Sequence, residues 1–186
     1  RIVAAALVVL AAVFGLLEVI GHFVGADLNF ENMLTPEAGT LGSVPVARMS
    51  PATGALFFLA GVGILFAAWR TRNQRLLNTT GILGALVVIG GTTILLGYLH
   101  GTPLLYTGET IPMAATTAIA FLFLGVGLMT AVGEQDLPMC LMAGQSTRAR
   151  LMRAFVPLAV TAVLVQGILH RLVPAGWITN EALSSA

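Results

Sequence analysis

The three histidines of the chain, His22, His100 and His170, each close a long apolar run. If the three runs are helices that cross a membrane in the same direction, their imidazoles lie at one face of that membrane. Three imidazoles can bind zinc or copper and leave a position open for water or a ligand. The three residues are therefore a candidate metal site, and the alternative is that they are hydrated residues at the membrane surface.

Two polar side chains stand one helical turn before a histidine. Glu18 precedes His22 by four residues and Gln166 precedes His170 by four, so each pair shares a helix face. Glu18 is thus a candidate fourth metal ligand, or an acceptor that fixes the tautomer of His22. The same place in the middle run holds Leu96, so the polar layer is incomplete. A haem would need only one or two of the histidines, but the chain lacks a haem-attachment cysteine motif.

Glu18 is also the only acidic residue inside an apolar run. An ionisable group at that depth is costly and marks a functional site by default. It is a candidate proton or cation site, or a partner for an arginine such as Arg48. The alternative is that its carboxylate reaches the membrane surface along its own apolar stem. Together with Gln166 and Tyr98, it makes up a polar layer in which a ligand is expected.

The composition places these residues in a membrane protein. The chain is 57% hydrophobic and 9% charged, with a mean hydropathy of +0.93, whereas about a quarter of the residues of a soluble domain are charged. The net charge is +1 and there is no basic run, so no nucleic-acid partner is expected. Cys140 is the only cysteine, which excludes an intrachain disulfide. The expected partner is the lipid bilayer.

Five apolar segments have the length of about 20 residues that a spanning helix needs. They are Ile2–Val24, Pro51–Trp69, Leu77–His100, Met113–Val132 and Met152–Leu172. Their uninterrupted apolar runs do not alternate, which excludes a β-barrel. Ser50 before Pro51 predicts a capping hydroxyl at the second helix, and Pro157 is expected near the start of the fifth, where a proline costs least.

The arginines give the orientation of these helices. They gather between the second and third segments and between the fourth and fifth, at Arg70, Arg72, Arg75, Arg148, Arg150 and Arg153. By the positive-inside rule, these loops and the N-terminus lie in the cytoplasm. The histidines then face outward.

An internal repeat connects the segments. The residues Met49, Thr53, Phe57, Gly61 and Gly63 recur 64 positions later as Met113, Thr117, Phe121, Gly125 and Gly127. The repeated unit is an outgoing helix, an outer loop and a returning helix, with copies at about 1–70, 76–133 and 148–186. The third copy stops where its returning helix would start. We expect an all-α polytopic transmembrane bundle of three helix-hairpin repeats, with five spans and a truncated sixth in one transmembrane domain. The paired glycines indicate close helix packing, and the long outer loop 25–50 is a candidate lid.

The stretch Arg48–Gly63 resembles an element of the multi-span N-terminal membrane regions of bacterial sensor proteins. Leu96–Tyr106 and Ile111–Ala118 are similar to the second part of such regions, and Arg148–Pro157 and Gln166–Arg171 to the third. These regions precede PAS, histidine-kinase or diguanylate-cyclase modules. The resemblance implies a sensory or anchoring domain of the bacterial inner membrane, in a homodimer or larger assembly. It gives no catalytic residue to this chain; a kinase or cyclase module would lie elsewhere in the full protein.

Two other functions fit the same residues. An accessory subunit of a membrane complex would use the histidines as metal, haem or pigment ligands, and a bound cofactor spectrum would identify it. A small transporter would line its path with Glu18 and Gln166. Against transport, the second to fourth segments contain few polar residues other than threonine and glycine, and none is clearly broken at the midplane.

Overall fold

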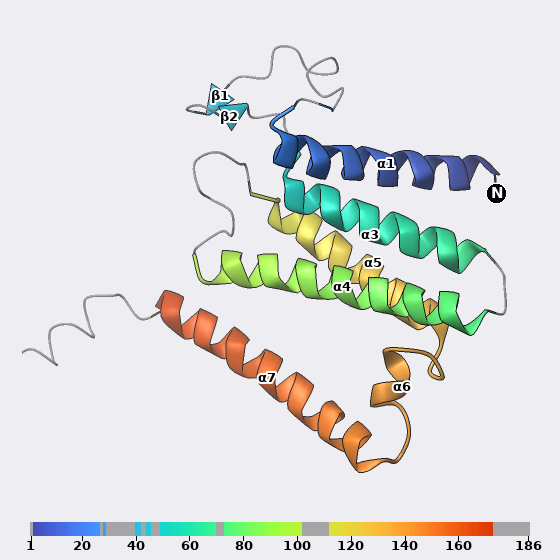
Figure 1. The fold of residues 1–186 in the computed structure, drawn as a ribbon. Helices are drawn as coiled ribbons and strands as arrows, with labels where there is room; N and C mark the ends of the chain where they lie inside the picture. Colours follow the sequence, from blue (N-terminus) through green and yellow to red (C-terminus); the bar gives the residue numbers. More distant parts are fainter. Residues whose placement is uncertain are drawn as a thin grey trace, which may run out of the picture.

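The computed structural model describes residues 2–26, 28, 40–41, 44–45, 49–69, 73–101 and 112–172. In these residues there are five long helices, α1 (Ile2–Val24), α3 (Pro51–Ala68), α4 (Gln74–Leu99), α5 (Ala115–Val132) and α7 (Thr147–Leu172), and a short one, α6 (Met139–Met142) (Figure 1). The two-residue strands β1 (Thr40–Leu41) and β2 (Val44–Pro45) pair antiparallel.

All five long helices are long and apolar enough to cross a membrane. The backbone groups of such segments must be satisfied internally when the segment lies in lipid, and a helix does this. The predicted all-α bundle with five spanning helices is therefore confirmed. The predicted sixth span lies after Leu172, outside the described residues, as do most of the loop 25–50 and the end of the third repeat.

The helices pack in a row rather than around one axis. α1 packs on α3, α3 packs on both α4 and α5, and α4 and α5 share the most extensive contact, while α7 touches α4 and α6 (Figure 1). In Figure 1, α1 and α7 are the two flanks of the bundle. α1, α4 and α7 finish at the same end, which we call the histidine end. The opposite end, where α4 and α7 begin, is the arginine end.

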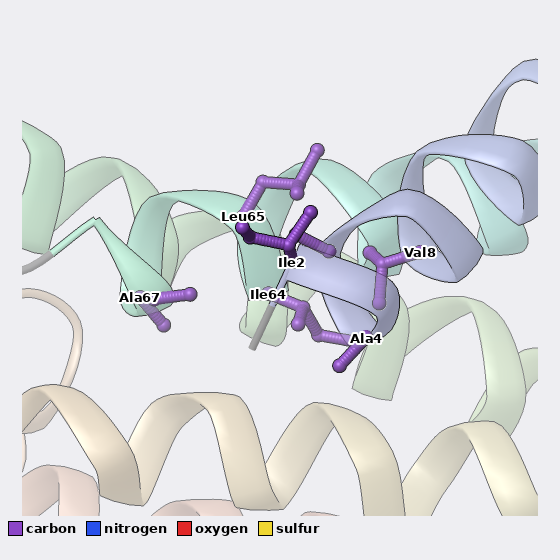
Figure 2. A pocket seen from close by; sticks show the side chains of 8 residues that line it. Ile2, Ala4, Val8, Ile64, Leu65 and Ala67 are labelled. Atoms are coloured by element: carbon purple, nitrogen blue, oxygen red, sulfur yellow. The ribbon is translucent and has the colours of Figure 1, made fainter.

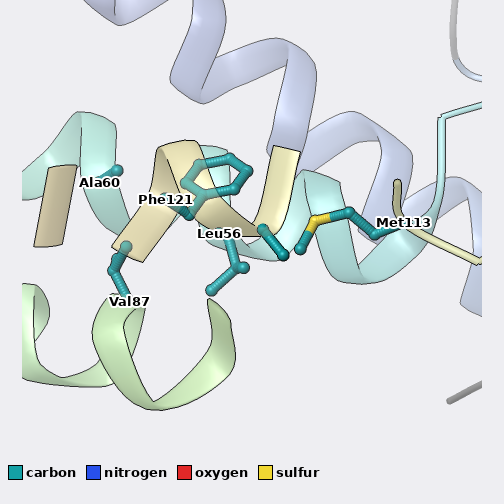
Figure 3. Packing of buried hydrophobic residues seen from close by; sticks show 6 residues of the cluster. Leu56, Ala60, Val87, Met113 and Phe121 are labelled. Carbon is teal, nitrogen blue, oxygen red and sulfur yellow. The ribbon is translucent and has the colours of Figure 1, made fainter. Parts of the chain in front are cut away.

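The core lies where α3, α4 and α5 meet (Figure 3). It consists of Leu56, Ala60, Val87, Met113, Ala118 and Phe121. Phe57 lies beside this cluster and meets Phe121 edge to face, with ring centroids 4.9 Å apart. These two phenylalanines occupy equivalent positions of the repeat, so the returning helices of the two hairpins contact each other through the same residue.

Small residues bring the helices of each hairpin together at equivalent places. A Cβ atom on Gly54 would lie 2.7 Å from the carbonyl oxygen of Gly15, and one on Gly91 would lie 2.9 Å from that of Ala118. The contacts Gly15–Gly54 and Ala12–Gly61 of the first hairpin correspond to Gly91–Ala118 and Val88–Gly125 of the second. The offset is 76 residues on the outgoing helix and 64 on the returning helix. The bounds of α3 and α5 also differ by 64 residues, which supports the internal repeat.

The start of α7 differs from the prediction. The helix begins at Thr147, five residues before the expected Met152, because the Ser146 hydroxyl accepts a hydrogen bond of 3.2 Å from the amide of Ala149. The arginines expected in a loop therefore lie in the first two turns of the helix. Pro157 was predicted near the helix start, but it lies in the helix interior. There its ring removes one backbone hydrogen bond of the helix.

The starts of α3 and α5 differ in another way. Ser50 occupies the cap position before Pro51, as predicted, but its side chain makes no capping hydrogen bond. α5 begins at Ala115 rather than at Met113. Met113 instead lies in the core, and its carbonyl accepts a 2.7 Å hydrogen bond from the hydroxyl of Tyr98.

Candidate polar site at the histidine end

Glu18 is buried between α1 and α3, with only 8% of its surface exposed. Its stem lies against Gly54: a Cβ atom on that glycine would be 3.0 Å from Cβ of Glu18 and 3.2 Å from its Cγ. Gly54 thus provides the space that the acidic side chain occupies. This burial favours a carboxyl group held between helices over one that reaches the surface along its stem.

Two residues with hydroxyl groups are buried at the start of α3. Ser50 is 5% exposed and Thr53 is 7% exposed. Ser50 is the cap residue before α3, and Thr53 and Gly54 lie in the first turn of the helix. The Oγ atom of Ser50 is buried without a hydrogen-bond partner. Among the described residues, the buried polar side chains are Glu18, Ser50, Thr53, Thr80 and Asp136. The stem of Glu18 packs on Gly54, which follows Thr53 directly and Ser50 by four residues; we call Glu18, Ser50 and Thr53 the α1–α3 polar cluster.

Of this cluster, only Glu18 is identifiable as a site residue from the sequence. Ser50 was assigned to capping because a serine before a proline is typical of a helix start. Thr53 was part of the repeat pattern. The signal that could have found Ser50 is the repeat itself, because its equivalent 64 positions later is the apolar Ala114.

His100 lies at the end of α4 and faces α7. Its Nδ1 is 2.8 Å from the carbonyl oxygen of Leu96, and because a carbonyl only accepts, Nδ1 carries the proton of this hydrogen bond. In the neutral imidazole, Nε2 is then the atom that accepts a hydrogen bond or binds a metal. A Cβ atom on Gly167 would lie 3.1 Å from Cε1 of His100. The glycine therefore allows α7 to approach the imidazole.

The other predicted site residues are spread over the histidine end. His22 is exposed on α1, and in Figure 1 α3 lies between that helix and α4, which ends at His100. Gln166 is exposed on α7, and the side chain of His170, in the last turn of that helix, is outside the described residues. Within the described part of the chain, no three His, Cys, Asp or Glu side chains are placed to hold a metal ion. A metal site of the three histidines with Glu18 stays a prediction.

Tyr98 has a structural contact in this region. Its hydroxyl donates to the carbonyl of Met113, which ties the last turn of α4 to the segment before α5. The phenol is half-buried. Tyr98 therefore helps to hold the second hairpin closed at the histidine end, and its role in a ligand layer stays a prediction.

The arginine end has an apolar hollow of about 530 Å³ between α1 and α3 (Figure 2). Its lining includes Ile2, Ala4, Val8, Ile64, Leu65 and Ala67. None of these side chains donates or accepts a hydrogen bond, so the hollow has no group that would orient a polar ligand. In the described residues of α1 and α3, the polar side chains Glu18, His22 and Thr53 lie toward the opposite, histidine end.

No protein family, no curated protein and no solved structure matches this chain.

Proposed function

We propose that this chain is the membrane-embedded sensory or anchoring domain of a bacterial signal-transduction protein in the inner membrane. The proposal has two supports in the sequence. The resemblance to the membrane regions of bacterial sensor proteins covers Arg48–Gly63 and further stretches up to Arg171. The arginines at one end of the bundle favour a cytoplasmic arginine end and an outward histidine end.

The observation that carries the proposal is the loose attachment of α7. Only 6% of its spanning window is buried, compared with 17–33% for the other four spanning helices. Between Thr147 and Leu169, only Ala149 and Gly167 are buried. A helix with few buried contacts can move at a low free-energy cost, and moving elements in proteins are drawn from such regions. α7 is thus suited to transmit a change in packing.

The contact that would respond is at the histidine end. There Gly167 meets the side-chain ends of Leu99 and His100 rather than backbone atoms. Side-chain ends can change rotamer, so this contact can take more than one arrangement. A ligand that binds at the histidine end and prefers one arrangement would shift α7. Because α7 finishes at this end, an output module in the cytoplasm would follow a further, returning span.

Cross-linking of α7 to α4 in the full-length protein tests the proposal. Cysteines replace Leu99 and Gly167 in a Cys140→Ser background, and each single-cysteine variant is the control. The side chain of a residue at 167 would lie 2.8 Å from Cδ2 of Leu99, so the two positions are close. Kinase autophosphorylation or cyclic-dinucleotide synthesis is measured in membranes, oxidised and then reduced.

We expect oxidation to change the output of the double variant, reduction to restore it, and both single variants to be insensitive. Equal output before and after a cross-link that has demonstrably formed would contradict a signalling role of α7. A full reading frame without any kinase, cyclase or other signalling module would exclude the proposed function.

An accessory subunit that binds a metal, haem or pigment is the second candidate. The observation in its favour is the hydrogen bond of His100 Nδ1 to Leu96, which fixes the tautomer and leaves Nε2 for coordination. Metal and chromophore analysis of the purified protein separates this candidate from the first.

A further inference from the structure

We infer that the apolar hollow between α1 and α3 binds one acyl chain of an anionic phospholipid, with the headgroup at the arginine end of the bundle. The hollow has a volume of about 530 Å³ and lies between the first two turns of α1 and the end of α3 (Figure 2). Apolar side chains of both helices line it. The site goes beyond the proposed signalling function and does not depend on it.

The second hairpin shows what fills the equivalent place there. With the offset of 76 residues that the glycine contacts define for the outgoing helices, Ala5 and Val8 of the hollow correspond to Gly81 and Gly84. Gly84 packs on α5, and a Cβ atom on Gly81 would meet the carbonyl group of Leu137. At the arginine end, the segment that follows α5 therefore fills the space that is open in the first hairpin.

The occupant in the second hairpin is a peptide, and its polar backbone has a partner there. The amide of Leu137 donates a hydrogen bond of 3.0 Å to the side-chain oxygen of Asn78. The equivalent of Asn78 in the first hairpin is Ile2, whose side chain lines the hollow and cannot accept a hydrogen bond. Because a buried peptide group without a partner is costly, the hollow suits an apolar chain rather than a peptide.

The short connection between α3 and α4 favours an occupant from outside the chain. Fourteen residues, 133–146, lead from α5 to α7, but only five, 69–73, lead from α3 to α4. A connection of five residues has no length to spare for a segment that folds back along its hairpin. Both helices of the hollow are long and apolar enough to span a membrane. The acyl chains of the surrounding lipid are then the nearest apolar occupant.

Positive charge beside the hollow favours an anionic headgroup. The connection after α3 contains Arg70 and Arg72 and no acidic residue. Arg75 follows in the first turn of α4, where it is exposed. Arginines close to a membrane surface attract lipids with anionic headgroups. A phospholipid whose chain lies in the hollow has its headgroup at this end of α3, so an anionic lipid should bind there more tightly than a zwitterionic one.

Lipid binding by the full-length protein tests the site. Delipidated protein in dodecylmaltoside is titrated with phosphatidylglycerol, or with phosphatidylcholine that has the same acyl chains, and native mass spectrometry counts the bound lipids. We expect one phosphatidylglycerol to bind more tightly than any further lipid and more tightly than phosphatidylcholine. Equal affinity for the two lipids, or no retained lipid, would overturn the inference.

A pair of alanine variants locates the acyl chain. Ala5→Leu fills part of the hollow and should weaken the binding of both lipids by about tenfold or more. Ala6→Leu makes the same change at an exposed neighbour, outside the residues that line the hollow, and should bind both lipids like the wild type. If Ala5→Leu also binds like the wild type, the chain does not lie in the hollow.

A pair of arginine variants tests the headgroup. The triple variant Arg70→Gln, Arg72→Gln and Arg75→Gln should bind phosphatidylglycerol about a hundredfold more weakly and phosphatidylcholine unchanged. The control removes the same charge from the start of α7 and should keep both affinities: Arg148→Gln, Arg150→Gln and Arg153→Gln. An equal loss in the two triple variants would contradict a headgroup beside the hollow.

A third measurement needs no variant. Phosphatidylglycerol with a photoreactive diazirine in its acyl chain is activated in phosphatidylcholine bilayers, and mass spectrometry identifies the labelled segments. Ile2–Val8 and Ile64–Ala68 should be labelled more strongly than Ala154–Leu158, an exposed apolar stretch of α7 that also lies toward the arginine end. Equal labelling of the three segments would indicate only surrounding lipid and would contradict a bound chain.

Discussion

Replacement of Gly125 by alanine is expected to force α4 and α5 apart. A Cβ atom at this position would lie 2.7 Å from the carbonyl oxygen of Gly84 and 2.9 Å from the amide nitrogen of Val88. Ordinary van der Waals contact begins at 3.4 Å, so the helices must separate by about 0.7 Å. Cγ2 of Val88 also lies 2.8 Å away, but a rotation of that side chain would leave the two backbone atoms in place.

The magnitude follows from two opposing effects. Overpacking of a tight contact costs about 1–3 kcal/mol, and a backbone obstacle belongs in the upper half of that range. Alanine gains back about 1 kcal/mol over glycine through its helix propensity. The expected net loss for Gly125→Ala is therefore about 1–2 kcal/mol.

Gly127 provides the matched control two residues further along the same helix. It is exposed, and nothing lies within 4 Å of a Cβ atom built on it. Gly127→Ala should therefore keep the propensity gain and be as stable as the wild type, or more stable by up to about 1 kcal/mol. The two variants should differ by about 1–3 kcal/mol.

Unfolding of both variants by SDS titration in dodecylmaltoside micelles, followed by circular dichroism, measures this difference. The same titration on the wild type gives the reference free energy of unfolding. If Gly125→Ala is as stable as Gly127→Ala, α4 and α5 do not approach each other closely at Gly125.

Two further predictions concern the arginine end and the histidines. Asn78→Ala removes the acceptor of a 3.0 Å hydrogen bond from the amide of Leu137, so we expect a loss of about 1 kcal/mol in the same titration; an unchanged free energy of unfolding would show that the bond adds no stability. If the histidines hold a metal or haem, the purified protein carries a stoichiometric metal or chromophore that His22→Ala, His100→Ala and His170→Ala each lose. A colourless, metal-free protein excludes the cofactor site and leaves the proposed sensory role in place.

The spanning helices could be predicted because hydropathy reports which residues lie in lipid. It does not report where a helix continues into water. α4 begins at Gln74 rather than at Leu77 because the side chain of Asn73 accepts a hydrogen bond from the amide of Arg75. The polar first turn of α7 was missed for the same reason. The short helix α6 is too small to give a periodic pattern.

The polar site could be predicted only in part. Glu18 was identifiable because an acid in an apolar run is conspicuous. In the sequence, the position equivalent to Glu18 in the second hairpin is Leu96, because both residues lie four positions before a histidine. By the packing contacts, the equivalent of Glu18 is instead Ile94, 76 residues later. The two hairpins align where small residues allow their helices to approach closely, not where the apolar runs end. The 78-residue spacing of His22 and His100 therefore differs from the 76-residue spacing of the packing contacts.

The contacts at the glycines also indicate where the bundle is rigid and where it can change. Gly15 meets Gly54, and Gly84 meets Gly125, through backbone atoms that cannot rotate away. The three atoms nearest to a Cβ on Gly167 all belong to the side chains of Leu99 and His100. A perturbation at the histidine end should therefore leave each hairpin intact and displace α7 first. The α1–α3 polar cluster lies inside the hairpin that Gly15 and Gly54 hold closed, so substitutions in this cluster should change the stability of that hairpin before they change the position of α7.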